Sequence, residues 1–268
     1  MKPVRQFAWV LLAMLSLASL GAGLWAPADY ATQFREVPNS PPSHQHLLGT
    51  DELGRDRFSR VLHGTRVSLL MAPAAALLSS LLAMFVGGVA GYLGGWWERG
   101  AMAATDLFLS MPWLFLLLAV RAMLPLNVSP MTSVAITFLL LGMLGWAASA
   151  RVLCAGAREL RNSDFVLQAR ASGVRGLRLL LIQVVPNLRP VLLAQFWISI
   201  PVFIISEANL GILGLGVAEP LPSWGSLLRE LESFTSFGFE ACKLVPLVLL
   251  ILAVSSFQII LSREEVCA

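Results

Sequence analysis

Long apolar intervals, interrupted by few charges, dominate the pattern of the chain. A helix needs about 20 apolar residues to cross the hydrocarbon core of a bilayer, so charge-free intervals of this length mark membrane spans. One further apolar stretch, residues 101–120, contains a single acid, Asp106. We predict six spans, at residues 6–26, 67–92, 102–121, 131–151, 190–211 and 243–261.

The composition agrees with this pattern. Of the 268 residues, 57% are hydrophobic and 13% are charged, so we expect an all-α, polytopic membrane helical bundle. The net charge of +3 indicates no nucleic-acid partner, because basic residues in membrane proteins mostly record orientation. Three cysteines are too few for a disulfide framework, and His44 with His46 has no further metal ligand nearby in sequence.

The distribution of charge predicts the orientation. Six spans place both termini on one side, and Lys2 with Arg5 ahead of the first span indicates the cytoplasm. Residues 151–189 contain seven arginines against two acids, so we expect the loop 152–189 to be cytoplasmic as well. Alternatively, the first span is a cleaved secretory signal, because Trp25-Ala26 resembles a cleavage site.

The predicted spans divide the chain into an N-terminal transmembrane helix (1–26), an extracytoplasmic linker segment (27–66) and a core (67–268). Prolines make the linker segment irregular, and no separate soluble domain fits there. Its last part, residues 46–60, predicts a turn followed by a solvated interfacial helix with ion pairs.

Two features of the spans indicate helix packing. Gly87, Gly91 and Gly95 repeat at a spacing of four, which places small residues along one stripe and allows close approach of another helix. Asp106 lies near the start of the third span, where a lone carboxylate avoids lipid. It either pairs inside the bundle or lines a pathway, and we favour pairing.

The cytoplasmic loop contains two short helical segments. Ser163 is placed to cap a first helix that begins at Asp164 and ends at Gly173. Phe165 and Ala169 share one face of it, which presents an aromatic ring that fits a protein groove. Alternatively, the hairpin lies flat on the lipid and its arginines hold it there.

A second short helix follows in the loop. Leu177, Leu180, Leu181 and Val184 recur at helical spacing, and Pro186 is expected to end the helix. We predict that this apolar face packs back on the bundle.

The sequence near the outer end of the fifth span predicts a bent backbone. Glu207 precedes the glycine-rich run 208–216, and Trp224 follows with an aromatic side chain suited to a membrane interface. We interpret this region as the outer rim, where a receptor docks and solute enters, with Glu207 as a hypothetical contact for a peptide amine. Alternatively, it is a return loop with an anchoring tryptophan.

Several of these segments resemble one family. Residues 165–173 (FVLQARASG) and 185–187 (VPN) resemble the EAA loop of ATP-binding-cassette (ABC) importer permeases. Three more segments resemble its dipeptide, oligopeptide and nickel branch, in the subunit type with an extra N-terminal span: residues 48–56 with 68–69, 90–97 with Asp106 and Pro112, and 213–216 with 222–225.

The resemblance, over residues 46–261, implies a type I ABC importer permease fold in a bacterial or archaeal cytoplasmic membrane. The chain would form half of a pathway for peptide-like solutes or nickel chelates. Its partners would be a second permease, two cytoplasmic ATPase subunits and an extracytoplasmic solute-binding protein. The chain has no phosphate-binding loop, so the resemblance implies no enzymatic activity or cofactor here, with ATP and Mg bound by the ATPase partners.

The resemblance also implies roles for individual residues. It assigns contact with the ATPase to loop positions Phe165, Ala169, Arg170, Gly173 and Pro186. Candidates for the pathway or outer rim are Glu207, Trp224 and Asp106.

The chain departs from the family pattern at Leu167-Gln168-Ala169, where Glu-Ala-Ala is usual, and in its tail after Gln258. The missing glutamate keeps a non-transporting scaffold subunit open as an alternative. A stand-alone secondary carrier or channel is a further alternative, although the sequence shows no internal repeat.

Overall fold

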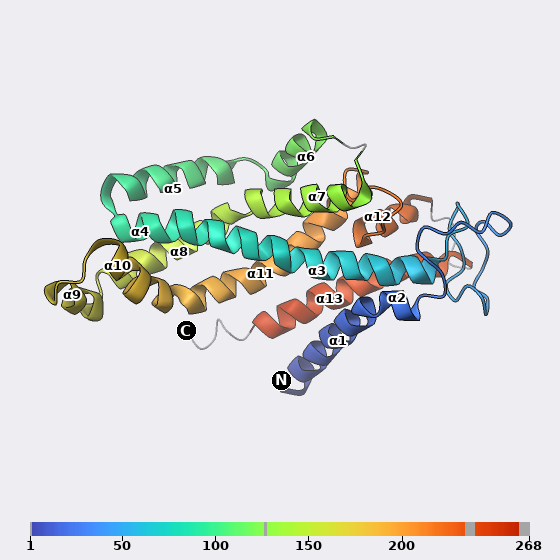
Figure 1. The fold of residues 1–268 in the computed structure, drawn as a ribbon, viewed down its shortest axis with the longest axis horizontal. Coiled ribbons are helices and arrows are strands. Elements are labelled where there is room, and N and C mark those ends of the chain that lie inside the picture. Colours follow the sequence, from blue (N-terminus) through green and yellow to red (C-terminus); the bar gives the residue numbers. More distant parts are fainter. Residues whose placement is uncertain (1, 126–127, 234–238, 263–268) are drawn as a thin grey trace. The chain divides into compact units, whose positions relative to one another are not determined.

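The computed structural model describes residues 2–125, 128–233 and 239–262, and Figure 1 shows their fold. Regular structure in these residues is helical, apart from two isolated β-bridges, Gln33 with Arg55 and Thr50 with Asp56. The helical elements, η marking π and 3-10 turns, are α1 (Lys2–Leu20), α2 (Ala22–Trp25), α3 (Arg57–Ala83), η1 (Met84–Gly88), α4 (Val89–Leu93), α5 (Gly95–Ser110), α6 (Trp113–Met123), α7 (Pro130–Leu144), α8 (Trp146–Arg161), α9 (Asp164–Ala171), α10 (Gly176–Leu179), η2 (Leu180–Val184), α11 (Val185–Ile212), α12 (Trp224–Arg229), η3 (Glu230–Ser233), η4 (Phe239–Leu244) and α13 (Val245–Leu261).

Five of the six predicted spans are confirmed by membrane-length helices within these residues. By length and composition, five stretches are able to cross a membrane: Pro3–Leu20, Arg57–Leu93, Pro130–Arg161, Gly176–Ile212 and Ala241–Leu261. Helices α5 and α6 make a sixth candidate if they count as one span. The chain is therefore an all-α, multi-pass membrane protein.

The third predicted span, 102–121, is not one straight helix. Helices α5 and α6 are bent by 85° at the break between them. Met111, which precedes Pro112, is extended with φ −82° and ψ 133°. A proline disfavours helical dihedrals in the residue before it, and this ends α5.

The chain forms two compact units. Unit 1 consists of residues 1–72, 118–138 and 201–268, and unit 2 consists of residues 73–117 and 139–200. In unit 1 the N-terminal helix α1 packs along α13 (Figure 1). In unit 2 the helix α8 packs against η1, α4 and α5.

Glycines set the close approach of α8 to the second predicted span in unit 2. A Cβ atom at Gly87 would lie 2.0 Å from the carbonyl oxygen of Ala150, and one at Gly91 would lie 2.3 Å from that of Cys154. The predicted close packing is confirmed for these two glycines. Gly95 differs, because it starts α5 with φ +60° and no atom lies within 4 Å of its Cβ position.

The predicted turn and ion pairs within residues 46–60 are present in unit 1, but the prediction that the helix is solvated is wrong. Helix α3 begins at Arg57 and continues into the second span, and Oδ2 of Asp56 accepts hydrogen bonds from the backbone N and Oγ of Ser59 at its start. The charged side chains around this start are buried rather than solvated. They belong to a set of six residues, called here the ion network: Asp51, Arg55, Arg57, Arg60, Glu219 and Glu230.

The ion network joins the linker segment to the chain after α11. Arg55 Nε lies 2.6 Å from Asp51 Oδ2, and Arg55 also pairs with Glu219. Arg60 NH2 lies 3.2 Å from Oε1 of Glu219 and 3.8 Å from Oε1 of Glu230. Buried charges need such partners, because desolvation alone costs several kcal/mol per ion.

The two glutamates of the network respond differently to their surroundings. Burial acts to raise the pKa of Glu219, but Arg60 and Arg55 outweigh burial and hold this pKa below its ordinary value of 4.5. Burial is the largest influence on Glu230 and raises its pKa above 4.5, although Arg60 and Arg57 oppose it. Glu219 is therefore the acid that these arginines keep charged.

The network predicts a pH-dependent contribution of Glu219 to stability. We expect Glu219→Gln to lower the free energy of unfolding by about 1 kcal/mol at neutral pH, because a half-exposed, charge-assisted hydrogen bond is lost. A carboxyl whose pKa is lower in the folded state stabilises fully above its unfolded pKa. This stabilisation is lost as pH falls below 4.5 and through the folded-state pKa.

Unfolding of the purified protein in detergent, compared at neutral and acidic pH, measures this effect. Glu52→Gln is the matched control, because Glu52 is an exposed acid of the linker segment that is not a member of the ion network. An equal deficit of Glu219→Gln at both pH values would contradict the assignment.

The glycine contact predicts a steric effect in unit 2. We expect Gly87→Ala to lower the free energy of unfolding by about 1–3 kcal/mol, because the added methyl group overlaps the Ala150 carbonyl and forces the helices apart. Gly100→Ala is the matched control, since no atom lies within 4 Å of its Cβ position. Thermal unfolding in detergent compares the two variants, and equal stability would refute the packing role.

Candidate functional site

The structure forms a hairpin in unit 2 from the predicted loop segments, here called the α9–α10 hairpin (residues 162–184). Helix α9 begins at Asp164, as predicted, and ends before Gly173, which has φ +88°. The N–H of Gly173 bonds to Arg170 O, and the N–H of Val174 bonds to Ala169 O. This pair of bonds is a Schellman motif, which requires a left-handed residue and so explains the glycine.

The N-terminal cap of α9 differs from the prediction, although its first residue does not. Ser163 is extended at the N-cap position, but its side chain makes no capping hydrogen bond. Its hydroxyl instead donates to the carbonyl oxygen of Leu160 at 2.6 Å. The serine therefore gives a hydrogen-bond partner to a carbonyl group at the end of α8, where carbonyl groups lack helical partners.

The residues assigned to partner contact lie mostly on α9. The Phe165 side chain is 39% exposed, while its neighbour Val166 is fully buried. Ala169 and Arg170 are half-buried, and Gly173 is exposed. The structure thus brings four of the five predicted positions onto one short helix and its end, and it places Pro186 on a separate helix, α11.

The second helical segment does not end at Pro186. The helix is continuous from Gly176 to Ile212, and Pro186 is the second residue of its α11 part. The five residues of η2 form a π-helical turn, in which the N–H of Val185 bonds to Leu180 O. This wider turn shifts the hydrogen-bond register just before the proline, so the helix continues.

The buried face of this segment differs in part from the prediction. Leu177 and Leu181, predicted to face the bundle, are exposed. The buried side of the hairpin forms a core with Ala157 of α8, and its members are Val166, Leu179, Leu180, Val184 and Leu188. The hairpin is therefore anchored on unit 2, and it presents Phe165 and two leucines outward.

Asp106 pairs with an arginine of α8. Its Oδ1 lies 3.3 Å from NH2 of Arg151, and both side chains are more than half exposed. Asp106 is therefore paired, but the exposure of both side chains does not place the pair inside the bundle, as the sequence interpretation favoured. Both residues belong to unit 2.

Glu207 and Trp224 lie in the interior of unit 1 rather than at a surface. Both are 0% exposed. Trp224 Nε1 donates to Thr65 Oγ1 at 3.0 Å, and its backbone N donates to Ser68 Oγ at 3.1 Å. Ser68 Oγ in turn donates to Glu207 Oε2 at 3.3 Å. The expectation of an interfacial tryptophan is therefore wrong, and Glu207 is closed to solute in this conformation.

Close backbone contact explains this burial. A Cβ atom at Gly211 would lie 2.3 Å from the backbone of Gly225, so α11 and α12 meet through two glycines. Ser223 and Ser226 form a capping box at the start of α12. The short helix folds back against α11, and Trp224 at its first position becomes core.

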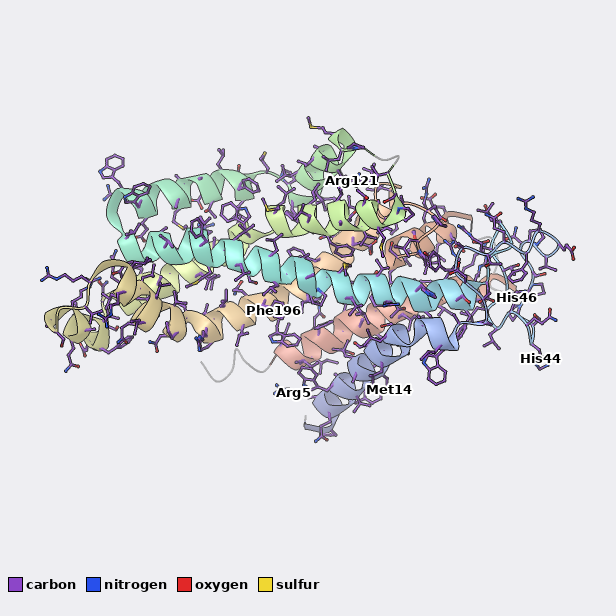
Figure 2. The ribbon with its side chains drawn as sticks, in the orientation of Figure 1. Arg5, Met14, His44, His46, Arg121 and Phe196 are labelled. Carbon is purple, nitrogen blue, oxygen red and sulfur yellow. The ribbon has the colours of Figure 1, made fainter. Side chains whose placement is uncertain are left out.

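The sequence interpretation missed Arg121, which lies near the end of α6 (Figure 2). Its side chain is 1% exposed, and NH2 donates to Ser133 Oγ and to Gly216 O, each at 3.3 Å. Ser133 Oγ also accepts from the backbone N of Ala218 at 3.0 Å. Arg121 and Ser133 thereby fix the glycine-rich loop in unit 1. Its position as a lone arginine at the end of an apolar span could have indicated a buried, functional or structural role.

A cavity of about 490 Å³ opens beside the ion network in unit 1. It is lined by Gln33, Asp51, Glu52, Leu53, Arg55, Glu219, Pro220 and Glu230. In the described residues, no group of three or more histidine, cysteine or acidic side chains is arranged to hold a metal ion. His46 Nδ1 instead lies 2.9 Å from Asp56 Oδ1.

Comparison with known proteins places these features in a family. Residues 80–264 match the family described as binding-protein-dependent transport system inner membrane component. An oligopeptide transport system permease protein of Bacillus subtilis is 32% identical over 221 residues, which cover 82% of this chain and 70% of the relative. A di/tripeptide transport system permease protein of Pseudomonas aeruginosa is 32% identical over 249 residues, 90% of this chain and 80% of the relative.

The family match spans more than half of the chain, and it includes α5 to α11 with the α9–α10 hairpin. The chain therefore belongs to the family of binding-protein-dependent transport system inner membrane components, the permease subunits of ABC importers.

Proposed function

We propose that this permease subunit forms half of a translocation pathway for peptide-like solutes. The support for the solute class comes from its relatives, which are permease proteins of oligopeptide and of di/tripeptide transport systems. The pathway is completed by a second, homologous permease. A nickel chelate is the second solute class, from the sequence resemblance alone.

The α9–α10 hairpin supports coupling to an ATPase. Phe165 exposes an apolar ring on a helix of eight residues whose end is set by a Schellman motif. A rigid helix that presents an aromatic anchor suits a groove on a protein partner. We assign this contact to Phe165, Ala169, Arg170 and Gly173, with Pro186 in a supporting position on α11.

The contact has a distinct charge pattern in this chain. Leu167 is exposed and apolar where the family usually has an acid, and the acid of α9 is Asp164 in its first turn. Arg170, Arg175 and Arg178 follow within the hairpin. We infer that the partner groove accepts a basic, apolar surface with little acidic contact.

The remaining partners and the orientation follow from the same proposal. Two cytoplasmic ATPase subunits bind ATP and Mg, and this chain contributes no cofactor site. Both termini and the α9–α10 hairpin face the cytoplasm, because residues 151–189 are rich in arginine. An extracytoplasmic solute-binding protein delivers solute to the opposite face.

Transport by the purified complex in lipid vesicles tests this function. We expect uptake of a labelled tripeptide only with the solute-binding protein, the ATPase subunits and ATP together. Uptake driven by an ion gradient without ATP would instead show a secondary carrier. No uptake under any condition, from an assembled complex that hydrolyses ATP, would show a scaffold subunit.

The docking assignment predicts the effect of a charge at Phe165. We expect Phe165→Asp to weaken binding of the ATPase by about 2 kcal/mol or more, roughly thirtyfold, because a charge enters an apolar groove. Ala171→Asp is the matched control, since Ala171 is exposed on the same helix and is not among the residues assigned to the contact. Co-purification and binding titration of the ATPase measure both variants.

Normal ATPase binding by Phe165→Asp in an inserted, folded chain would refute the assignment. Equal loss in both variants would show that charge anywhere on α9 is disruptive, and it would remove the specific role of Phe165.

A further inference from the structure

The α9–α10 hairpin makes a polar contact with the second predicted span through Tyr92. The hydroxyl of Tyr92, in α4, donates a hydrogen bond to the carbonyl oxygen of Gly176 at 2.9 Å. The side chain of Tyr92 is half-buried and packs against the buried core of the hairpin. One side chain therefore contributes both apolar packing and a directed hydrogen bond to the junction.

The acceptor lies where the hairpin turns. Gly176 begins α10 with φ +61°, after the extended residue Arg175. No atom lies within 4 Å of a Cβ placed on Gly176, so its left-handed backbone rather than crowding accounts for the glycine. Along the chain, this turn connects α9 to α10.

The donor lies on a segment that is fixed to α8. A Cβ atom at Gly91 would lie 2.3 Å from Cys154 O, and one at Gly94 would lie 1.8 Å from NH1 of Arg161. Gly94 has φ +71° and ends α4. Helix α4 is therefore a five-residue segment held closely between the hairpin and α8.

The other end of α4 continues into a π-helical turn. This turn, η1, spans Met84–Gly88 and connects α4 to the rest of the second span. π-Helical turns interrupt the regular hydrogen-bond pattern and occur frequently at functional sites. A displacement applied to α4 thus reaches the span at the point where its hydrogen-bond register changes.

We propose that Tyr92 is a positioning residue that transmits movement of the α9–α10 hairpin to the second span. The proposal rests on the proposed function, in which the ATPase moves the hairpin. The hydrogen bond to Gly176 keeps the turn and α4 together, and the ring seats α4 against the hairpin core. Without the hydroxyl, the hairpin still moves with the ATPase, but α4 moves with the hairpin less completely.

The variant Tyr92→Phe tests the proposal in the complete complex, because it removes the hydroxyl and keeps the ring. Uptake of labelled tripeptide and ATP hydrolysis are measured on the same vesicles. We expect ATP hydrolysis to continue and the solute transported per ATP to fall about two- to tenfold, the change that corresponds to one hydrogen bond. Tyr30→Phe is the matched control, because Tyr30 is the only other tyrosine of the sequence.

The ratio of transport to hydrolysis separates a transmitting role from a structural one. A purely structural hydroxyl would lower the thermal stability, and it would lower uptake and hydrolysis together, with the ratio unchanged. That result, or an unchanged ratio at normal stability, would overturn the proposal.

The variant Phe165→Asp distinguishes failure of this inference from failure of the proposed function. If Phe165→Asp loses ATPase binding while Tyr92→Phe keeps the wild-type ratio, only the role of Tyr92 is wrong. If Phe165→Asp retains binding and uptake, the docking function itself is wrong, and a reduced ratio in Tyr92→Phe would then need another origin.

Discussion

A charge withdrawn from water must meet a compensating partner, and this requirement accounts for much of the arrangement within unit 1. In unit 1, the buried arginines at the start of α3 meet Asp51 from the linker segment and Glu219 from the chain after α11. Arg121 meets neutral partners instead, the Ser133 hydroxyl and a backbone carbonyl. Because each isolated charge would cost several kcal/mol, these contacts specify which loops come together.

The α9–α10 hairpin is held in place differently, by apolar side chains and backbone turns rather than by ion pairs. Its buried side chains hold it on α8 and α4, while Phe165 remains exposed at the far side of a short helix. Left-handed glycines at positions 173 and 176 set the two ends of the turn between its helices. A surface built this way keeps its shape without a partner, so a groove binds it with little loss of conformational entropy.

Much of the fold was predictable from local sequence, and the exceptions have physical reasons. Apolar intervals located the spans, and Gly173 located the end of α9. Trp224 was assigned to an interface because its sequence neighbours are polar or small, whereas its burial depends on glycine contact with a distant helix. The ion network was missed because Arg60 and Glu219 are 159 positions apart, a separation at which composition and periodicity give no pairing information.

Two π-helical turns, at residues 84–88 and 180–184, interrupt long helices among the described residues. Each such turn holds one residue more than the α-helical turn it replaces, and each residue of an α-helix advances the side chains by about 100°. Loss of a single residue elsewhere in these helices would rotate every side chain beyond it, whereas loss at either π-helical turn would restore a regular α-helical turn and keep those side chains on their faces. Sequence alignments of distant relatives should therefore tolerate one-residue gaps at these two positions more readily than elsewhere in the same helices.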